Sequence, residues 1–169
     1  MILIDSHCHL NMKDFDNDLD EVVLNAKKNN IGGMLTICTK IEELNNIKEI
    51  SNKYNIWYSG GVHPHNVSEI ELSNINKIYD HSSNSNFIGI GETGLDFYYD
   101  NKSRKMQITS FIKHIKLARE LDIPVIVHTR DADLETLKIL KNEYSKGKFK
   151  CLIHCFTASK EFALEVLNM

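Results

Sequence analysis

The sequence predicts an α/β fold in which helices cover a parallel sheet. Two observations predict it. Short apolar runs alternate with segments of helical periodicity, and polar side chains suited to metal binding follow the ends of several runs. A chain of 169 residues, of which 42% are hydrophobic and 25% charged, can form one domain with a substantial core. We therefore expect residues 1–169 to form a single domain.

The predicted strands are apolar runs of about three to seven residues, the size of buried strands in a parallel sheet. They lie at residues 2–4, 33–38, 56–62, 87–90, 124–127 and 151–153.

The predicted helices lie between these runs and carry apolar side chains at helical spacing. The first stripe consists of Leu19, Val22, Val23 and Ala26. Asp18 and Glu21 form a predicted capping box at its start. Later stripes consist of Ile41, Leu44 and Ile47, of Ile108, Phe111, Ile112, Ile115 and Ala118, and of Leu134, Leu137 and Leu140. A last helix is expected to begin near Ser159.

Strand–helix units at a spacing of roughly 30 residues favour either an open doubly wound sheet or a barrel. A complete barrel of eight units needs about 250 residues. The sequence ends within an apolar helical segment that contains Ala163, Leu164, Val166 and Leu167. We therefore expect about six of eight units, with the domain incomplete at its C-terminus.

Charge and hydropathy narrow the class of protein. The net charge of −3 argues against a broad basic surface for nucleic acid, although a local pocket is compatible with it. No apolar run approaches the roughly 20 residues of a membrane helix, and no signal peptide is recognisable. The four cysteines form no CxxC pair, which predicts reduced thiols. We expect a cytoplasmic protein that does not bind membranes.

Six of the eight histidines follow predicted strands, and a glutamate follows another. These residues are His7 and His9 after the first strand, His63 and His65 after the third, Glu92 after the fourth, His128 after the fifth and His154 after the sixth. The carboxyl ends of parallel strands meet at one edge of a sheet, where active sites of α/β folds are built. We therefore expect these side chains to converge.

Histidines together with a carboxylate are ligands for zinc, manganese or iron. Four histidines and Glu92 exceed what one structural zinc needs, and a glutamate can bridge two ions. Two ions about 3.5–4 Å apart can share an activated water and stabilise the attacking and leaving oxygens. The pattern predicts hydrolysis of a phosphate ester or an amide.

Five motifs occur in one order along the chain: DSHCHL, GGVHPH, GETGLDF, VIVHTRDA and HCFTAS. In this order and spacing they resemble the TatD family of metal-dependent deoxyribonucleases, a branch of the metal-dependent hydrolase barrels. The resemblance runs from Ile2 to the last predicted helix. It implies a (β/α) fold of the TIM-barrel type. It also implies divalent-metal-dependent cleavage of phosphodiester bonds in DNA by a water that two metal ions activate.

The resemblance also implies site roles. One metal ion would be bound by His7 and His9, the second by His128 and His154, and Glu92 would bridge them. Magnesium is the ion usually supplied to the family, and zinc and manganese are further candidates. The family carries one more essential aspartate after a later strand, and the sequence ends before that position. A truncated remnant that is inactive, or that needs a partner, is therefore an alternative.

The candidate catalytic residues are Glu92, Arg130, His63 and His65. By resemblance, His63 and His65 contact the scissile phosphate or support the metal ligands. The alternative is a packed, hydrogen-bonded structural pair. Arg130 either clamps a phosphate through its guanidinium or lies on the surface at a helix start. Asp96 either orients a ligand or fixes a turn.

Two further alternatives concern substrates. An amidohydrolase acting on C–N bonds uses a similar barrel and HxH motif, but commonly has a lysine where this chain has Glu92, which favours the TatD resemblance. The aromatic run Phe97, Tyr98 and Tyr99 stacks on bases or packs against a helix, and packing is the favoured expectation.

Overall fold

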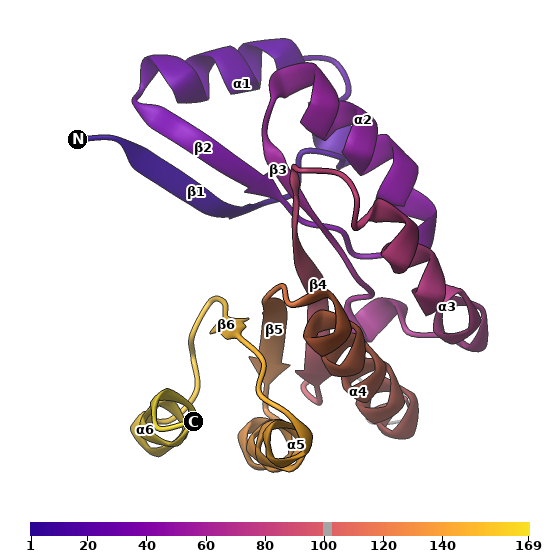
Figure 1. The fold of residues 1–169 in the computed structure, drawn as a ribbon. Coiled ribbons are helices and arrows are strands. Elements are labelled where there is room, and N and C mark those ends of the chain that lie inside the picture. Colours follow the sequence, from indigo (N-terminus) through magenta and orange to yellow (C-terminus); the bar gives the residue numbers. More distant parts are fainter. Residues whose placement is uncertain (100–102) are drawn as a thin grey trace.

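The computed structural model describes residues 1–99 and 103–169, which form a curved, six-stranded sheet with helices on its outer side (Figure 1). The strands are β1 (Leu3–Cys8), β2 (Ile31–Thr36), β3 (Trp57–Gly60), β4 (Phe87–Asp96), β5 (Val125–Arg130) and β6 (Cys151–Ile153). They pair in sequence order, and every pair is parallel. In a doubly wound fold the strand order reverses at one point of the sheet, and here it does not. A continuous sequential order is that of a TIM-barrel-type fold.

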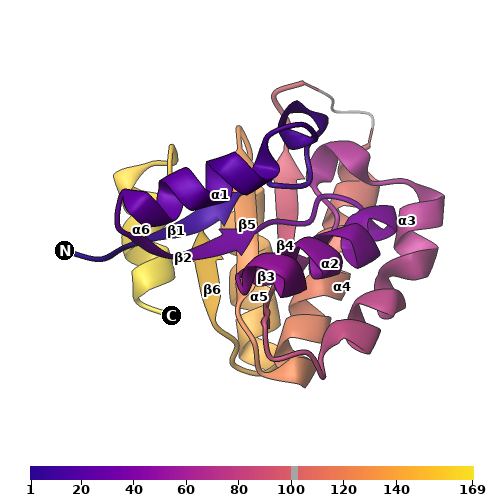
Figure 2. The same cartoon turned by 90° about the horizontal axis from the view of Figure 1, so that it is seen from above.

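The helices connect successive strands. They are α1 (Leu19–Lys28), α2 (Leu44–Tyr54), α3 (Glu69–Asn74), α4 (Arg104–Leu121), α5 (Asp133–Lys146) and α6 (Lys160–Leu167). Short 3₁₀ helices span Lys13–Phe15, Ile41–Glu43, Pro64–Asn66 and Ile75–His81. Seen from above, the helices surround the strands (Figure 2). Within residues 1–99 and 103–169, no helix is long and apolar enough to cross a membrane.

The main core lies between the sheet and its helices. Ile47, Ile90, Phe111, Ile115 and Leu140 belong to it, and each is fully buried. These residues come from α2, β4, α4 and α5, so burial of their apolar area ties the outer helices to the strands.

The two faces of the sheet have separate apolar clusters. Val125 and Val127 of β5 belong to the main core, whereas Ile126 between them packs with Leu35 and Ile37. Successive side chains of a strand point to opposite faces, which explains the division. The apolar run of β5 therefore contributes to both faces of the sheet. The first run differs from its prediction as a buried strand, because Ile2, Leu3 and Ile4 are exposed.

Strand β4 is longer than the predicted run at residues 87–90, so Glu92 lies inside a strand. Gly91 (φ +143°, with a cis peptide bond to Glu92) and Gly94 (φ +139°) have backbone conformations that favour glycine. A Cβ atom at Gly94 would lie 2.0 Å from the carbonyl oxygen of His128. The close approach of β4 to β5 therefore requires glycine, and it brings His128 next to the Glu92 strand.

Two local predictions are wrong. Asp18 is the N-cap residue of α1, but its side chain makes no capping hydrogen bond, so the capping box with Glu21 does not form. Leu134 is 86% exposed, because the buried face of α5 is carried instead by Thr136, Ile139 and Leu140.

Candidate metal centre

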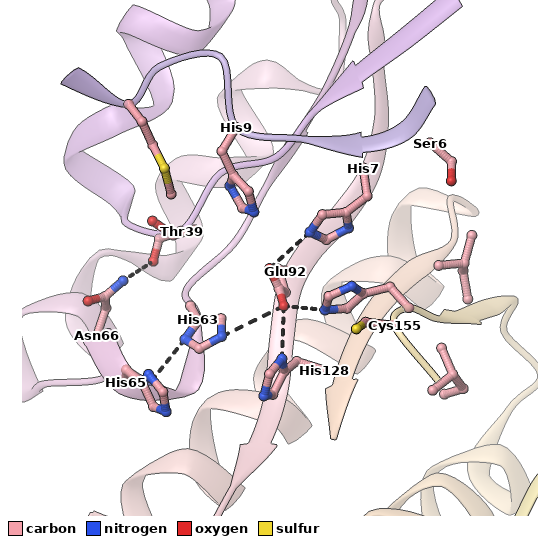
Figure 3. Close-up of a pocket in the computed structure, with 14 residues that line it drawn as sticks. Ser6, His7, His9, Thr39, His63, His65, Asn66, Glu92, His128 and Cys155 are labelled. Carbon is pink, nitrogen blue, oxygen red and sulfur yellow. Dashed lines mark hydrogen bonds and ion pairs between the residues drawn. The ribbon is translucent and has the colours of Figure 1, made fainter. Parts of the chain in front are cut away.

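A cavity of about 840 Å³ opens at the carboxyl ends of the strands (Figure 3). Its walls contain every histidine that the sequence places at a strand end, together with the glutamate: His7, His9, His63, His65, Glu92, His128 and His154. The structure thus brings together side chains that five different strands or their following loops supply.

Glu92 lies at the centre of this set and is 2% exposed. Its Oε1 atom is 3.0 Å from Nδ1 of His128 and 2.5 Å from Nε2 of His154. Its Oε2 atom is 3.3 Å from Nε2 of His7, and Nε2 of His63 lies 3.7 Å from Oε1. One buried carboxylate therefore contacts four imidazoles.

The ligand atoms form two groups of three, and within each group they lie within 4.8 Å of one another. One group is His7, Glu92 and His154, and the other is His63, Glu92 and His128. Imidazole nitrogens and carboxylate oxygens suit zinc and related divalent ions, so each group can hold one ion. The resemblance instead pairs His154 with His128. Oε1 of Glu92 contacts both of these rings, so that pairing stays a prediction.

The curvature of the sheet explains the grouping. His7 belongs to β1 and His154 follows β6, which are the two outermost strands of the sheet. Their rings nevertheless stack, with centroids 4.0 Å apart and an interplanar angle of 9°. The sheet therefore curls far enough to bring side chains from its first and last strands into contact.

His9 lies beside these groups, with its ring centroid 5.1 Å from that of His7. The Nδ1 atoms of His7 and His9 are buried and have no hydrogen-bond partner among the described residues. A buried ring nitrogen without a partner is costly, and a bound cation would supply one. These nitrogens and the surrounding donor set fit divalent metal ions.

The carboxyl group of Glu92 is ionised. Burial raises its pKa, but hydrogen bonds with His128 and His154 outweigh burial and hold the pKa well below its ordinary value. An ionised carboxylate with two oxygens facing different imidazoles can serve two ions at once.

The histidines differ in their protonation. Burial lowers the pKa of His63 to about 4, and burial followed by repulsion from His7 lowers the pKa of His9. For His128, burial lowers the pKa, but the hydrogen bonds with Glu92 and Asp96 outweigh it and the pKa is raised. His63 and His9 are therefore neutral near pH 7, the form in which imidazole binds metal.

Asp96, at the end of β4, supports two of the histidines. It is 1% exposed, and its Oδ2 atom lies 2.8 Å from Nε2 of His65 and 3.1 Å from Nε2 of His128. Its Oδ1 atom accepts a hydrogen bond from the backbone N–H of Tyr98 at 3.0 Å. A carboxylate on the far nitrogen of a ligand histidine fixes the orientation of the ring. Asp96 thus both orients His128 and fixes the turn after β4.

The sequence offers two roles for Asp96, orienting a ligand or fixing a turn, and the observed contacts fit both. Glu92 and Asp96 are four residues apart, and side chains at even spacing on a strand share a face. The apolar run ends at residue 90, so the sequence does not show that both acids lie within one strand.

His63 and His65 are held by the loop after β3. The N–H of His63 and the side-chain amide of Asn66 donate to the carbonyl oxygen of Thr39 at 3.0 and 3.1 Å. Nδ1 of His63 accepts a hydrogen bond from the backbone N–H of His65 at 3.2 Å. His63 therefore faces Glu92, whereas His65 faces Asp96 and is the more exposed of the two.

Arg130 ends β5 and lies next to the cavity rather than within either group. Its guanidinium carbon is 3.8 Å from the ring centroid of Tyr98 and 4.8 Å from that of Tyr99. These two tyrosines are 55% and 67% exposed, whereas Phe97 is 8% exposed. The expected packing of the aromatic run is observed for Phe97 and is wrong for Tyr98 and Tyr99.

Known proteins share both the sequence and the fold. A family model described as TatD related DNase matches residues 4–169. An uncharacterized metal-dependent hydrolase of Buchnera aphidicola is 38% identical over 179 residues, which covers 100% of this chain and 67% of that protein. The human deoxyribonuclease TATDN3 is 32% identical, over 96% of this chain and 64% of the human protein.

The crystal structure of YjjV, a TatD homologue from Escherichia coli K12, superposes with a TM-score of 0.87 at 23% sequence identity. The superposition covers 98% of this chain and 64% of that one, and at this identity it shows a shared fold. The chain spans about two thirds of the length of these proteins.

Proposed function

Because this chain belongs to the family of TatD-related DNases, we propose that it is a divalent-metal-dependent hydrolase that cleaves phosphodiester bonds in DNA. The observation that carries the proposal is the position of Glu92 between two histidine groups. Matching relatives are named metal-dependent hydrolase and deoxyribonuclease, which supports the same reaction class.

We assign His7, Glu92 and His154 to one ion, because their ligand atoms lie close together. His9, whose ring lies against that of His7, is the further ligand for this ion. When bound, divalent ions supply Lewis acidity that stabilises negative charge on phosphate oxygens. The chain contributes an ionised carboxylate and imidazoles held in position by burial.

We assign His63, Glu92 and His128 to the second ion. Asp96 holds His128 from behind, so the Nδ1 atom of that ring stays directed at Glu92. The low pKa of His63 keeps its ring neutral and able to bind a cation.

His65 and Arg130 flank the two groups, and we assign them to contact with the substrate phosphate. The planar guanidinium of Arg130 matches two phosphate oxygens. Glu92 and Asp96 place negative charge behind the cavity, which repels a phosphate unless cations offset it. Binding of substrate is therefore expected to depend on bound metal.

The test combines metal analysis with two substrates. The purified chain is loaded with magnesium, manganese or zinc, and metal per chain is measured by mass spectrometry. The loaded protein is then incubated with labelled DNA and with a dihydropyrimidine. We expect about two ions per chain and metal-dependent cleavage of DNA that a chelator abolishes.

Glu92→Gln is the decisive variant, because it removes the charge that both groups share. It is expected to lower the metal content and reduce DNA cleavage to background. The matched control is Glu42→Gln, which removes a carboxylate whose side chain is 74% exposed and should change neither quantity. Hydrolysis of the dihydropyrimidine alone would replace the proposal with an amidohydrolase, and a chain that binds no metal would overturn it.

A further inference from the structure

An aromatic corner lies beside the metal centre, and neither histidine group uses it. It consists of Tyr98, Tyr99 and Arg130. The two tyrosine rings are nearly perpendicular, with centroids 4.6 Å apart and an interplanar angle of 88°. Both rings are more than half exposed. Exposed aromatic side chains present flat apolar faces on which a ligand ring can stack.

The aromatic corner is held by contacts with the site. Asp96, which orients His128, also accepts the backbone hydrogen bond of Tyr98. The ring of Tyr99 packs edge-on against His65, with centroids 5.5 Å apart. The guanidinium of Arg130 covers the faces of both tyrosine rings on one side. A ligand that stacks there meets side chains that are already ordered, which lowers the entropy cost of binding.

A hollow of about 460 Å³ joins the aromatic corner to the metal centre. Tyr98 and Arg130 of the aromatic corner line it together with His128 and His154 of the metal centre. His128 and His154 also line the main cavity. A single extended ligand can therefore occupy both spaces.

We propose that the aromatic corner binds an unpaired nucleobase of DNA, in the nucleotide next to the phosphate at the metal centre. This subsite rests on the proposed function, because it belongs to the same substrate. Every base has a π face, so stacking on Tyr98 or Tyr99 tolerates any sequence. Arg130 stacks on these rings and lines the same hollow as His128 and His154. Its guanidinium can therefore contact the phosphate that follows the base.

The same geometry selects for single strands. A base inside a duplex is stacked on its neighbours, and its release costs a few kcal/mol. A base in single-stranded DNA or at a frayed end is free to stack on an aromatic side chain. The aromatic corner therefore favours single-stranded or frayed DNA over a closed duplex.

The test measures binding rather than cleavage. The probes are a nuclease-resistant, fluorescein-labelled oligothymidylate, an abasic oligomer of equal length, and a blunt duplex, each titrated against metal-loaded protein by fluorescence anisotropy. Tyr98→Leu and Tyr99→Leu remove the π face but keep apolar volume at exposed positions, and Tyr98→Phe keeps the ring. The matched control is Tyr79→Leu, at a tyrosine that is 54% exposed on the 3₁₀ helix Ile75–His81.

Each leucine variant of the aromatic corner is expected to raise the Kd for oligothymidylate by about 5- to 150-fold, the range for loss of one stacked base. Tyr98→Phe and Tyr79→Leu should bind as the parent does. Binding of the abasic oligomer and of the blunt duplex should be the same for parent and variants. Metal content should be the same for all variants, and thermal melts confirm that they fold.

The proposal is overturned by leucine variants that bind oligothymidylate as tightly as the parent, by equal losses on the abasic oligomer, or by a parent that does not bind oligothymidylate. The proposed function is decided separately, by metal content and DNA cleavage of the parent. If the parent cleaves DNA but substitution of either tyrosine leaves the Kd unchanged, the proposed function is supported and the base-binding subsite is ruled out. A parent that binds in a base-dependent way but holds no metal keeps the subsite and loses the function.

Discussion

The Nε2 atom of His114 accepts a hydrogen bond from the backbone N–H of Val62 at 3.1 Å. The other ring nitrogen, Nδ1, faces the carbonyl oxygen of Ser110 at 2.8 Å, so it carries the proton. His114 is fully buried in α4, and Val62 directly precedes His63. A histidine outside the cavity thus fixes the backbone from which a candidate metal ligand projects.

Replacing His114 by leucine is expected to destabilise the protein by about 1–3 kcal/mol, because the buried N–H of Val62 loses the imidazole that accepts its hydrogen bond. Urea denaturation followed by circular dichroism measures the change. His114→Gln, whose amide oxygen can accept the same hydrogen bond, should lose less. Equal stability of parent and leucine variant would show that this hydrogen bond contributes nothing.

Stability is expected to fall as the pH falls below about 6.5, in part because of His114. Burial lowers the pKa of His114 to about 4 in the folded chain, whereas the unfolded chain keeps the ordinary value of 6.5. As the pH falls, the unfolded state therefore binds a proton at this histidine before the folded state does. The contribution of His114 to stability is intact above pH 6.5 and is lost as the pH falls toward 4.

The loss from this one group should reach about 3 kcal/mol at pH 4. Denaturation curves of parent and His114→Leu between pH 7 and pH 4 isolate it, because His63 and other titrating groups are common to both. The leucine variant should show the shallower decline with pH. Parallel declines would contradict a neutral, buried His114.

Asp96→Asn is expected to weaken metal binding by about 10- to 100-fold, the usual cost of losing a carboxylate that orients a ligand histidine. The asparagine keeps the size of the side chain but removes the charge behind His65 and His128. Isothermal titration calorimetry with manganese or zinc measures the effect. Asp80→Asn, at an exposed aspartate, is the matched control and should bind metal as the parent does.

Added divalent metal is expected to raise the stability of the chain by about 2.7 kcal/mol at a free concentration one hundred times the Kd. For a protein of this size, that corresponds to an increase in Tm of about 5–10 °C. A chelator should reverse the shift. His7→Ala should show a smaller one, and an unchanged shift in that variant would remove His7 from the ligand set.

The periodicity of the sequence predicts the strands and main helices well. Each observed strand overlaps a predicted run, and the helices with strong apolar stripes lie where expected. The extension of β4 through Glu92 to Asp96 was not predictable, since polar residues inside a strand interrupt the apolar run. Helix α3 escapes prediction because it has no buried residue and therefore no apolar stripe.

The gathering of histidines follows from their positions at strand ends, but their division into groups does not. The contact between His7 and His154 depends on how far the sheet curls, which no local pattern encodes. The hydrogen bond between His114 and Val62 joins residues 52 positions apart and is equally invisible to periodicity. The exposure of Tyr98 and Tyr99 depends on the direction that the chain takes after Asp96.

Because Glu92 serves both histidine groups, the two proposed ions cannot be taken up independently. The first ion that binds neutralises part of the carboxylate charge that the second ion needs. By linkage, the second ion changes the binding affinity for the first by the same factor. A metal titration should then give two unequal association constants instead of one constant counted twice. The half-loaded protein is a distinct species, with its own population at intermediate metal concentrations.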